Sequence, residues 1–402
     1  MSALGSARRR RTTVMLVINL VALLVLGGMG YAGYIALRNY EGATKVGAEF
    51  VGLPTTPVGM MGIVDADNRL TSLALFVLRP TQGTDEASVQ RGGTIVPVPV
   101  TADTTLGVGE QRIPLAGVYA EGGADALVLA VESTLSITLD VATVATPAEA
   151  EALLQAVSPI RATFATEVVG RLDGKELSLY DAGENTLSAT QAVQVLTATV
   201  EGQTDRQRRA NVEAVWAAVA AAVGEGVSAV AADAPVASLA DLVSKLFAGR
   251  VDARVLPADP IDDSAAPEGL DVESIDRAEA IWVLATIAPK SMSAPAPGLV
   301  FRIEAPPGYE TRVKFAIKAL LFLGANVSSV YLQGPVQEAT IYLIADPRIA
   351  AQAESSNELF GLFELAEPEM PTEGIDVVLQ LGTDFLTGEG ETLPTTTSTE
   401  PA

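Results

Sequence analysis

The run SLALFVL, Ser72–Leu78, is apolar almost throughout, and it decides how the rest of the chain can fold. A short apolar run of this kind predicts a β-strand. Met60–Val64 before it and TIVPVPV, Thr94–Val100, after it are also strand-like. Pro97 and Pro99 interrupt the last run, so it is expected at a sheet edge or a strand end.

Helical patterns follow these strands. Apolar residues recur at helical spacing over Asp125–Leu135, and Pro147 starts PAEAEALLQAV with the early glutamates typical of a helix N-terminus. Strands are predicted over Leu139–Val144 and Ala280–Ile287. Further amphipathic helices are predicted over Ala189–Thr199, Arg206–Val223 and Ser238–Leu246. The region 58–289 is therefore predicted to be one α/β domain.

A second, smaller domain is predicted over residues 299–386, after a Pro/Ser-rich linker at 290–298 that should let it move. The order β-α-β-β-α-β predicts a small sandwich. Its first helix should turn Phe315, Ala319, Leu320 and Leu323 inward. Residues 387–402 are predicted to be disordered. The expected elements are Leu299–Glu304, Tyr309–Gly324, Val327–Leu332, Thr340–Ala345, Pro347–Phe363 and Ile375–Leu381.

The N-terminus has the pattern of a membrane anchor. Four arginines, Arg8–Arg11, precede the uncharged run VMLVINLVALLVLGGMGYAGYIAL, Val14–Leu37. At about 1.5 Å per residue this run would form a helix of roughly 36 Å, enough to span a bilayer. The positive-inside rule puts residues 1–13 in the cytoplasm. Residues 38–57 are then a tether, and the bulk of the chain is expected outside the cell membrane.

Composition excludes several kinds of chemistry. The chain has no Cys and no His, which removes Ser-His-Asp and Cys-His nucleophiles, thiolate or imidazole metal sites, and disulfides. Its formal net charge of −23 makes nucleic acid an improbable partner, because phosphates would be repelled. Carboxylates, Arg, Lys, Tyr, Ser and Thr remain available, with an oxygen-ligated metal.

Several segments resemble the LytR-CpsA-Psr family. TIVPVPVTADTT (94–105) is similar to a family strand ending in S-I-P-R-D-T, with Asp103 and Thr104 matching its last two residues. QRIPLAGVYAEGG (111–123) is similar to G-K-I-N-A-A-Y-A-x-G-G, with Arg112 at the Lys. TDRQRRANVEAVW (204–216) resembles D-x-x-R-x-x-R-Q-Q, with Arg206 and Arg209 at its arginines. IDVVLQLGTDF (375–385) resembles the closing strand of a small C-terminal domain often appended in actinobacteria.

The resemblance implies a membrane-anchored α/β protein that moves cell-wall glycopolymer from a polyprenyl-pyrophosphate carrier onto peptidoglycan, using Mg²⁺. The chain departs from the family at chemically important positions. Ala102 stands at the catalytic arginine, Thr197 and Thr199 stand at two more arginines, and Thr71 stands at an aspartate that helps hold Mg²⁺. Because arginine is the residue best suited to bind pyrophosphate, these departures predict a pseudoenzyme.

Each candidate site residue has two interpretations. Arg206 and Arg209 lie at i, i+3 and form either a phosphate clamp or a solvated basic patch on a helix. Asp103 either holds a metal or caps a turn.

Three functions follow. The first is a non-catalytic protein that binds a polyprenyl-linked wall precursor or a wall-assembly partner. The second is an active Mg²⁺-dependent phosphotransferase that uses Asp103 for the metal and Arg112, Arg206 and Arg209 for phosphates. The third is a tethered scaffold.

Overall fold

The computed structural model describes most of the chain beyond the predicted anchor. Among the residues that the structure describes, no helix combines the length and the apolar character needed to cross a membrane. The predicted anchor 14–37, its basic tail 1–13 and almost all of the predicted disordered tail lie outside the described residues. The described residues are 50–80, 91–105, 111–172, 175–228, 236–261, 271–354 and 359–388.

A five-stranded mixed sheet forms the centre of the large domain, with the strand order β4-β1-β2-β3-β9. Strands β1, β2 and β3 form an antiparallel meander. The outer strands β4 and β9 run parallel to their neighbours β1 and β3. The predicted strands at 60–64 and 72–78 are confirmed, and the one predicted over 94–100 is confirmed up to Pro97. The bounds are β1 Val58–Val64, β2 Leu70–Leu78, β3 Gly93–Pro97, β4 Val141–Ala145 and β9 Val251–Ala253.

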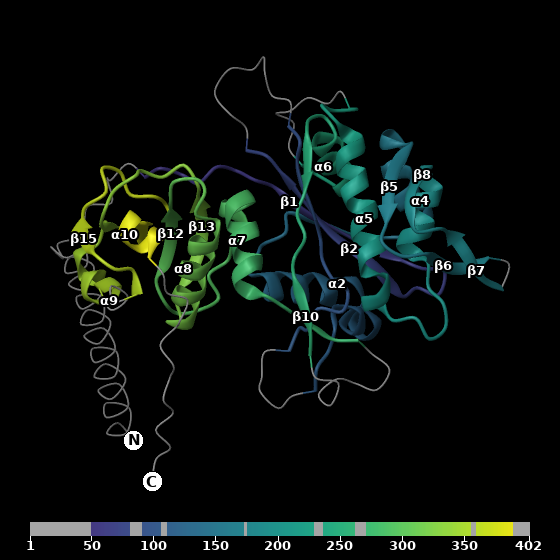
Figure 1. Cartoon of the computed structure of the whole chain (residues 1–402), viewed down its shortest axis with the longest axis horizontal. Helices are drawn as coiled ribbons and strands as arrows, with labels where there is room; N and C mark the ends of the chain where they lie inside the picture. The colour runs from purple at the N-terminus through teal and green to yellow at the C-terminus, as the bar shows by residue number, and fades with distance from the viewer. Residues whose placement is uncertain are drawn as a thin grey trace, which may run out of the picture. The chain divides into compact units, whose positions relative to one another are not determined.

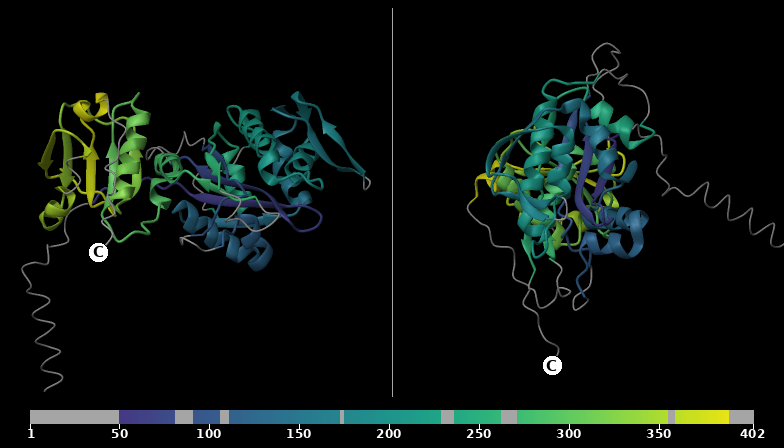
Figure 2. Two further views of the ribbon diagram at one scale, coloured as in Figure 1. Left: turned by 60° about the horizontal axis from the view of Figure 1, so that its bottom comes forward. Right: turned by 90° about the vertical axis from the view of Figure 1, so that its right-hand side faces the viewer.

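Helices cover both faces of this sheet (Figures 1 and 2). On β1, Met61 and Ile63 face one core, which four helices within residues 147–246 complete. Val58 and Met60 face a second core, which α2 (Leu115–Leu135) and α7 (Arg277–Ile287) complete. Strands buried on both faces need apolar residues at every position, which explains the near-continuous run at 72–78. The mixed α/β class is thereby confirmed.

Most helices begin at residues that the sequence marks. Thr146, Ser188 and Thr204 each cap a helix: the side chain of the cap accepts from the backbone N–H three residues later, and the side chain of that residue accepts from the backbone N–H of the cap. These capping boxes fix the starts of α3, α4 and α5. The bounds are α3 Pro147–Leu154, α4 Ala189–Thr197, α5 Asp205–Val223 and α6 Leu239–Leu246.

The sequence did not predict the start of α2 or the small sheets. Helix α2, Leu115–Leu135, begins ten positions before Asp125 and is kinked at Gly123, where φ is 71°. The pairs β5–β8, β6–β7 and β10–β11 are short, and β7 is mostly exposed, so they lack a strong apolar pattern. Their bounds are β5 Ile160–Phe164, β6 Val168–Leu172, β7 Lys175–Tyr180, β8 Gly183–Leu187, β10 Ala258–Pro260 and β11 Glu273–Ile275.

The strand predicted over Ala280–Ile287 is wrong: the segment belongs to helix α7, Arg277–Ile287. Ile281 and Ala285 pack into the core of the small domain, whereas Val283 and Leu284 pack into the core of the large domain. A helix buried on two sides has no polar face, so its sequence shows no 3.6-residue period.

The segment 290–298 is held on both sides, contrary to the prediction of a free linker. The backbone N–H of Ser293 donates to Ser136 O at 2.8 Å, and Thr138 N donates to Ser291 O at 2.7 Å. On the small-domain side, Asn326 Nδ2 donates to Ala296 O at 2.8 Å. These bonds satisfy backbone groups that a flexible linker would leave to water.

In the small domain a five-stranded sheet, in the order β13-β12-β16-β14-β15, packs against α8. Ala319 and Leu320 face inward as predicted, Phe315 is only partly buried, and Leu323 is 45% exposed. The helix predicted over 347–363 is confirmed at its start, where a 3-10 turn (Pro347–Ile349) leads into α9, and is wrong at its end, where Phe363 begins the edge strand β15. The bounds are β12 Val300–Glu304, α8 Glu310–Phe322, β13 Asn326–Tyr331, β14 Thr340–Ile344, α9 Ala350–Glu354, β15 Phe363–Ala366, β16 Val377–Gln380 and α10 Thr383–Thr387.

Candidate functional site

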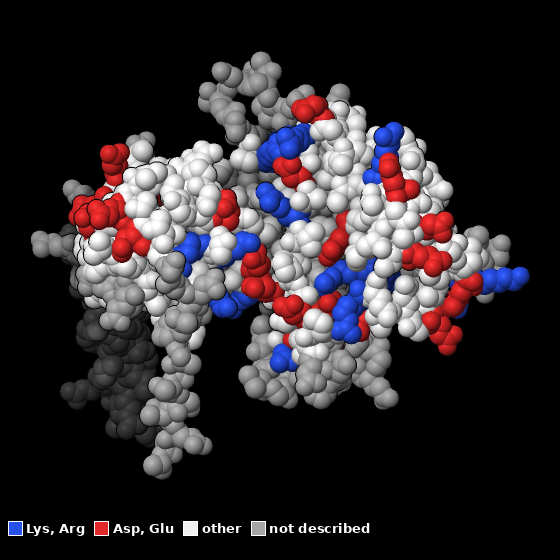
Figure 3. All heavy atoms as spheres, in the orientation of Figure 1, with Lys and Arg blue, Asp and Glu red and all other residues white. Residues whose placement is uncertain are grey.

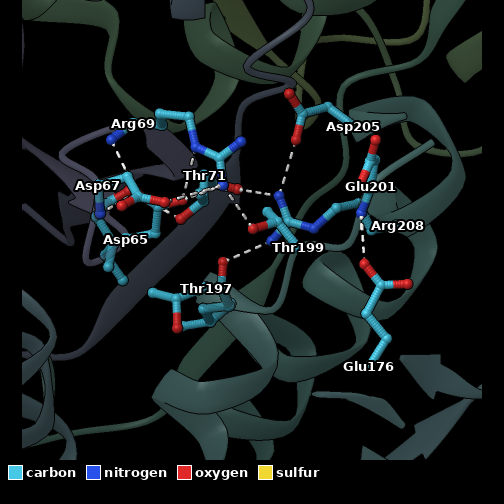
Figure 4. Close-up of polar contacts among 12 residues, drawn as sticks. Asp65, Asp67, Arg69, Thr71, Glu176, Thr197, Thr199, Glu201, Asp205 and Arg208 are labelled. Carbon is cyan, nitrogen blue, oxygen red and sulfur yellow. Dashed lines mark hydrogen bonds and ion pairs between the residues drawn. The ribbon is translucent and has the colours of Figure 1, made fainter. Parts of the chain in front are cut away.

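A buried arginine, Arg208, lies at the centre of the polar groups beside α5 (Figure 4). Its Nη1 donates to Thr71 O at 3.0 Å and to Asp205 Oδ1 at 2.8 Å, and its Nη2 donates to Leu196 O at 2.7 Å. Burial lowers the pKa of Arg208 below its ordinary value, and Asp205 opposes that shift. The guanidinium therefore joins β2, the end of α4 and the start of α5.

A tight turn after β1 holds the second charged group of this region. Asp65 Oδ1 accepts from the backbone N–H groups of Asp67 and Arg69, both at 2.9 Å. Arg69 Nε donates to Asp65 Oδ2 at 2.9 Å, and Arg69 Nη2 donates to the Thr199 hydroxyl at 2.9 Å. Thr199, which stands at an expected arginine, thus accepts from an arginine of the same chain.

Arg206 and Arg209, the two predicted phosphate contacts on α5, each pair with a carboxylate from the segment before α7. Arg206 Nη2 lies 3.4 Å from Asp271 Oδ1. Arg209 Nη1 lies 2.7 Å from Glu273 Oε1, and its Nε lies 3.6 Å from Glu213 Oε1. Both guanidinium groups are neutralised within the chain.

Glu273 is fully buried and accepts from both Arg209 and the Thr101 hydroxyl. Burial raises the pKa of Glu213; the nearby Arg209 opposes this shift and Glu273 adds to it. Buried carboxylates of this kind are costly unless they are paired. The positive charge of Arg209 is therefore needed between the carboxylates of Glu213 and Glu273.

Arg112 and Asp103 form a separate pair, and the backbone N–H of Asp103 donates to Glu273 O at 2.8 Å. Arg112 Nη1 donates to Asp103 Oδ2 at 2.8 Å, and the backbone N–H of Thr105 donates to Asp103 Oδ1 at 3.0 Å. The three predicted arginines therefore do not converge on Asp103. Only Arg112 reaches it, while Arg206 and Arg209 pair with other carboxylates.

These residues do not fit a Mg²⁺ site at Asp103. Both carboxylate oxygens of Asp103 already accept hydrogen bonds. Among the residues that the structure describes, no group of three or more acidic side chains could hold a metal ion. A Mg²⁺ ion bound through this one carboxylate would have to displace Arg112 or the Thr105 N–H from it.

The cleft beside these groups, between β2, β3 and α5, is narrow. Thr71, Pro97, Arg208 and Arg209 are among its lining residues, and its volume is about 20 Å³. Room of that size holds about one water molecule. Trp216 fills the adjoining core, with its ring 5.7 Å from that of Phe76.

Four members of this region were not predicted from the sequence: Arg208, Asp65, Arg69 and Glu273. The helical period contained a signal for Arg208, because Asn211, Val215 and Val219 mark the buried face of α5 and Arg208 continues it. Glu273 had no such signal, since its partners come from distant parts of the chain. Lys/Arg and Asp/Glu side chains also intermix on the face drawn in Figure 3, which is typical of local pairing.

Comparisons with known proteins return structures rather than sequences. No family model matches the chain, and no curated protein matches it. The solved structures to which the chain is similar include LytR-CpsA-Psr family proteins. TagT bound to LIIa-WTA is 17% identical, with a TM-score of 0.38, covering 57% of this chain and 88% of that one.

Two further structures are similar at the same level. B. subtilis TagV is 13% identical, with a TM-score of 0.39, covering 57% of this chain and 94% of that chain. The LytR-CPS2A-psr family protein YwtF (TagT) with bound octaprenyl pyrophosphate lipid is 16% identical, with a TM-score of 0.35, covering 56% and 86%.

Proposed function

We propose that this chain is a cell-envelope protein of the LytR-CpsA-Psr type that binds a polyprenyl-linked wall precursor without transferring its glycopolymer. One observation carries the proposal: Arg112, Arg206 and Arg209 each pair with a carboxylate of the same chain. A phosphate would have to displace those carboxylates before it could use the arginines.

The narrow cleft also bears on how the precursor is held. A volume of about 20 Å³ beside Arg208 has no room for a polyprenyl chain. In this proposal recognition rests on the sugar part of the precursor, because the arginines that could bind its phosphates are already paired. The predicted anchor at 14–37 keeps the protein in the cell membrane, where such precursors are found, with the bulk of the chain on the extracytoplasmic side.

Native mass spectrometry of the full chain in detergent tests the binding. The expected result is an intact adduct with an added polyprenyl-pyrophosphate-linked disaccharide, and the same adduct with Arg206→Ala, since Arg206 pairs with Asp271. A chain that neither co-purifies with carrier lipid nor binds the added carrier contradicts the proposal.

An activity assay distinguishes the phosphotransferase alternative. The same lipid-linked disaccharide is incubated with peptidoglycan and Mg²⁺, and release of the polyprenyl carrier is followed. We expect none. If the unmodified chain releases the polyprenyl carrier, and each of Arg206→Ala and Arg209→Ala abolishes that release, the chain is a transferase and the proposal is overturned.

Accessibility to protease tests the expected location. In intact cells with a permeable wall, protease added outside should degrade the region 58–386 and leave residues 1–13 protected. The opposite pattern would contradict the extracytoplasmic assignment.

A further inference from the structure

A second, wider cleft lies next to the Arg112–Asp103 pair. Its volume is about 470 Å³, and its walls come from the segment 103–105, the end of α2, β11 and the start of α7. A volume of this order is typical of sites for small molecules. We call it the donor cleft, defined by Arg112, Ser133, Thr134, Ser274 and Arg277.

The donor cleft contains hydrogen-bond donors that nothing in the described part of the chain uses. The side chains of Ser133, Thr134, Ser274 and Arg277 form no hydrogen bond or ion pair with any described residue. Arg112 Nε is buried and likewise has no partner there. A ligand in the cleft does not reach this buried atom, so the donors open to a ligand are those of the other four side chains.

The charge balance of the donor cleft is positive. Asp103 is the one carboxylate among its described lining residues, and both of its oxygens are engaged by Arg112 and by the Thr105 N–H. Asp276, the neighbour of Arg277 in sequence, instead caps α7 through the N–H groups of Ala278 and Glu279. Arg277 therefore has no counter-charge in the described structure.

Arg277 also stands where a cation does not help the fold. It is exposed and is the first residue of α7. A positive charge at a helix N-terminus is unfavourable, because the N-terminal end of the helix dipole is itself positive. The stability of α7 thus gives no reason for an arginine at this position.

We infer that the donor cleft binds an anionic sugar, a sugar carrying a phosphate or a carboxylate group. Arg277 binds the anionic group, and Ser133, Thr134 and Ser274 bind the sugar hydroxyls. Ile275 and Pro295 offer apolar surface to the ring carbons. A free phosphate would fill only a small part of the volume. The inference shares Arg112 with the proposed function, but its other residues play no part there, so it can hold even if the chain binds no lipid-linked precursor.

Titration calorimetry of the full chain tests the inference. Glucose 1-phosphate and glucuronic acid are the two anionic probes, and glucose and inorganic phosphate are the controls. At least one anionic sugar should bind saturably, with an affinity roughly tenfold or more above both controls. The stronger of the two identifies the anionic group.

Variants then locate the site. Arg277→Ala should weaken binding of the stronger probe by roughly tenfold or more, and Thr134→Val should weaken it by a smaller factor. Arg161→Ala is the matched control, because Arg161 is exposed on β5 and has no partner among the described residues. Its affinity should equal that of the unmodified chain.

Three results would overturn the inference. The first is no binding of either anionic sugar at millimolar concentration. The second is equal binding of inorganic phosphate, which would remove the sugar from the assignment. The third is an equal loss in Arg161→Ala and Arg277→Ala, which would reflect the overall charge rather than the donor cleft.

Discussion

Arg208, the fourth residue of α5, and Arg277, the first residue of α7, both lie near the N-terminal end of a helix but in opposite surroundings. Arg208 is buried, and its Nη atoms donate to a carboxylate and two backbone carbonyls. Arg277 is exposed, and no described residue pairs with it. In a chain of net charge −23, an unpaired arginine is the less expected of the two. The difference teaches that partners, rather than position on a helix, separate an arginine that holds the fold from one that is available to a ligand.

Arg208→Ala should lower the free energy of unfolding more than any of the other substitutions. A small loss would contradict the difference drawn between Arg208 and Arg277. The substitution leaves Asp205 without its cation, and it leaves Thr71 O and Leu196 O without donors. Removing one partner of a buried charged network typically costs about 3–5 kcal/mol. Guanidinium unfolding of the full chain measures it. Arg161→Ala, the exposed control, should change the free energy of unfolding by less than about 0.5 kcal/mol. A loss below about 1 kcal/mol for Arg208→Ala would show that the buried pairing is not structural.

Arg209→Ala should have the next largest effect, about 1–3 kcal/mol, because it leaves Glu273 buried without its cation. Arg209 itself is 28% exposed, so the loss is smaller than at Arg208. A double-mutant cycle with Glu273→Gln isolates the pair and should give a coupling above about 0.5 kcal/mol. Strictly additive losses would mean that the two side chains do not depend on each other.

The sequence predicted those parts of the fold that depend on local patterns. Strands β1 to β3 and helices α4 to α6 follow from apolar runs and from caps such as Ser188 and Thr204. The prediction of a strand at α7 was wrong, because burial of this helix on two sides removes the helical period from its sequence. The site was less predictable. Arg206 and Arg209 were found by resemblance, but their partners Asp271 and Glu273 lie far away in sequence. Only tertiary structure brings them together.

Glu213→Gln should change how the stability of the chain depends on pH. Burial raises the pKa of Glu213 above 4.5 in the folded chain, so between 4.5 and that higher value the folded state binds more protons than the unfolded state. Stability of the unmodified chain therefore falls as pH rises through this window. Glutamine does not titrate, so the difference in melting temperature, variant minus unmodified, should increase from pH 4 to pH 7. A difference that is constant or decreases would show that Glu213 ionises as freely in the folded state as in the unfolded one.

Arg277→Ala should have the smallest effect on stability, and its sign is informative. The side chain has no partner among the described residues, so its removal breaks no contact there. It also removes a cation from the N-terminus of α7, where exposed charges of the wrong sign cost about 0.3–1 kcal/mol. The free energy of unfolding should therefore stay the same or increase, by up to about 1 kcal/mol at low salt. The increase should shrink at high salt, because exposed charges are screened. Arg277→Lys, which keeps the charge, should show no increase. A loss above about 1 kcal/mol would place Arg277 with Arg208 as a structural residue. An arginine that lowers stability while it supports binding is what the donor cleft requires, since binding residues are often retained at a cost to the fold.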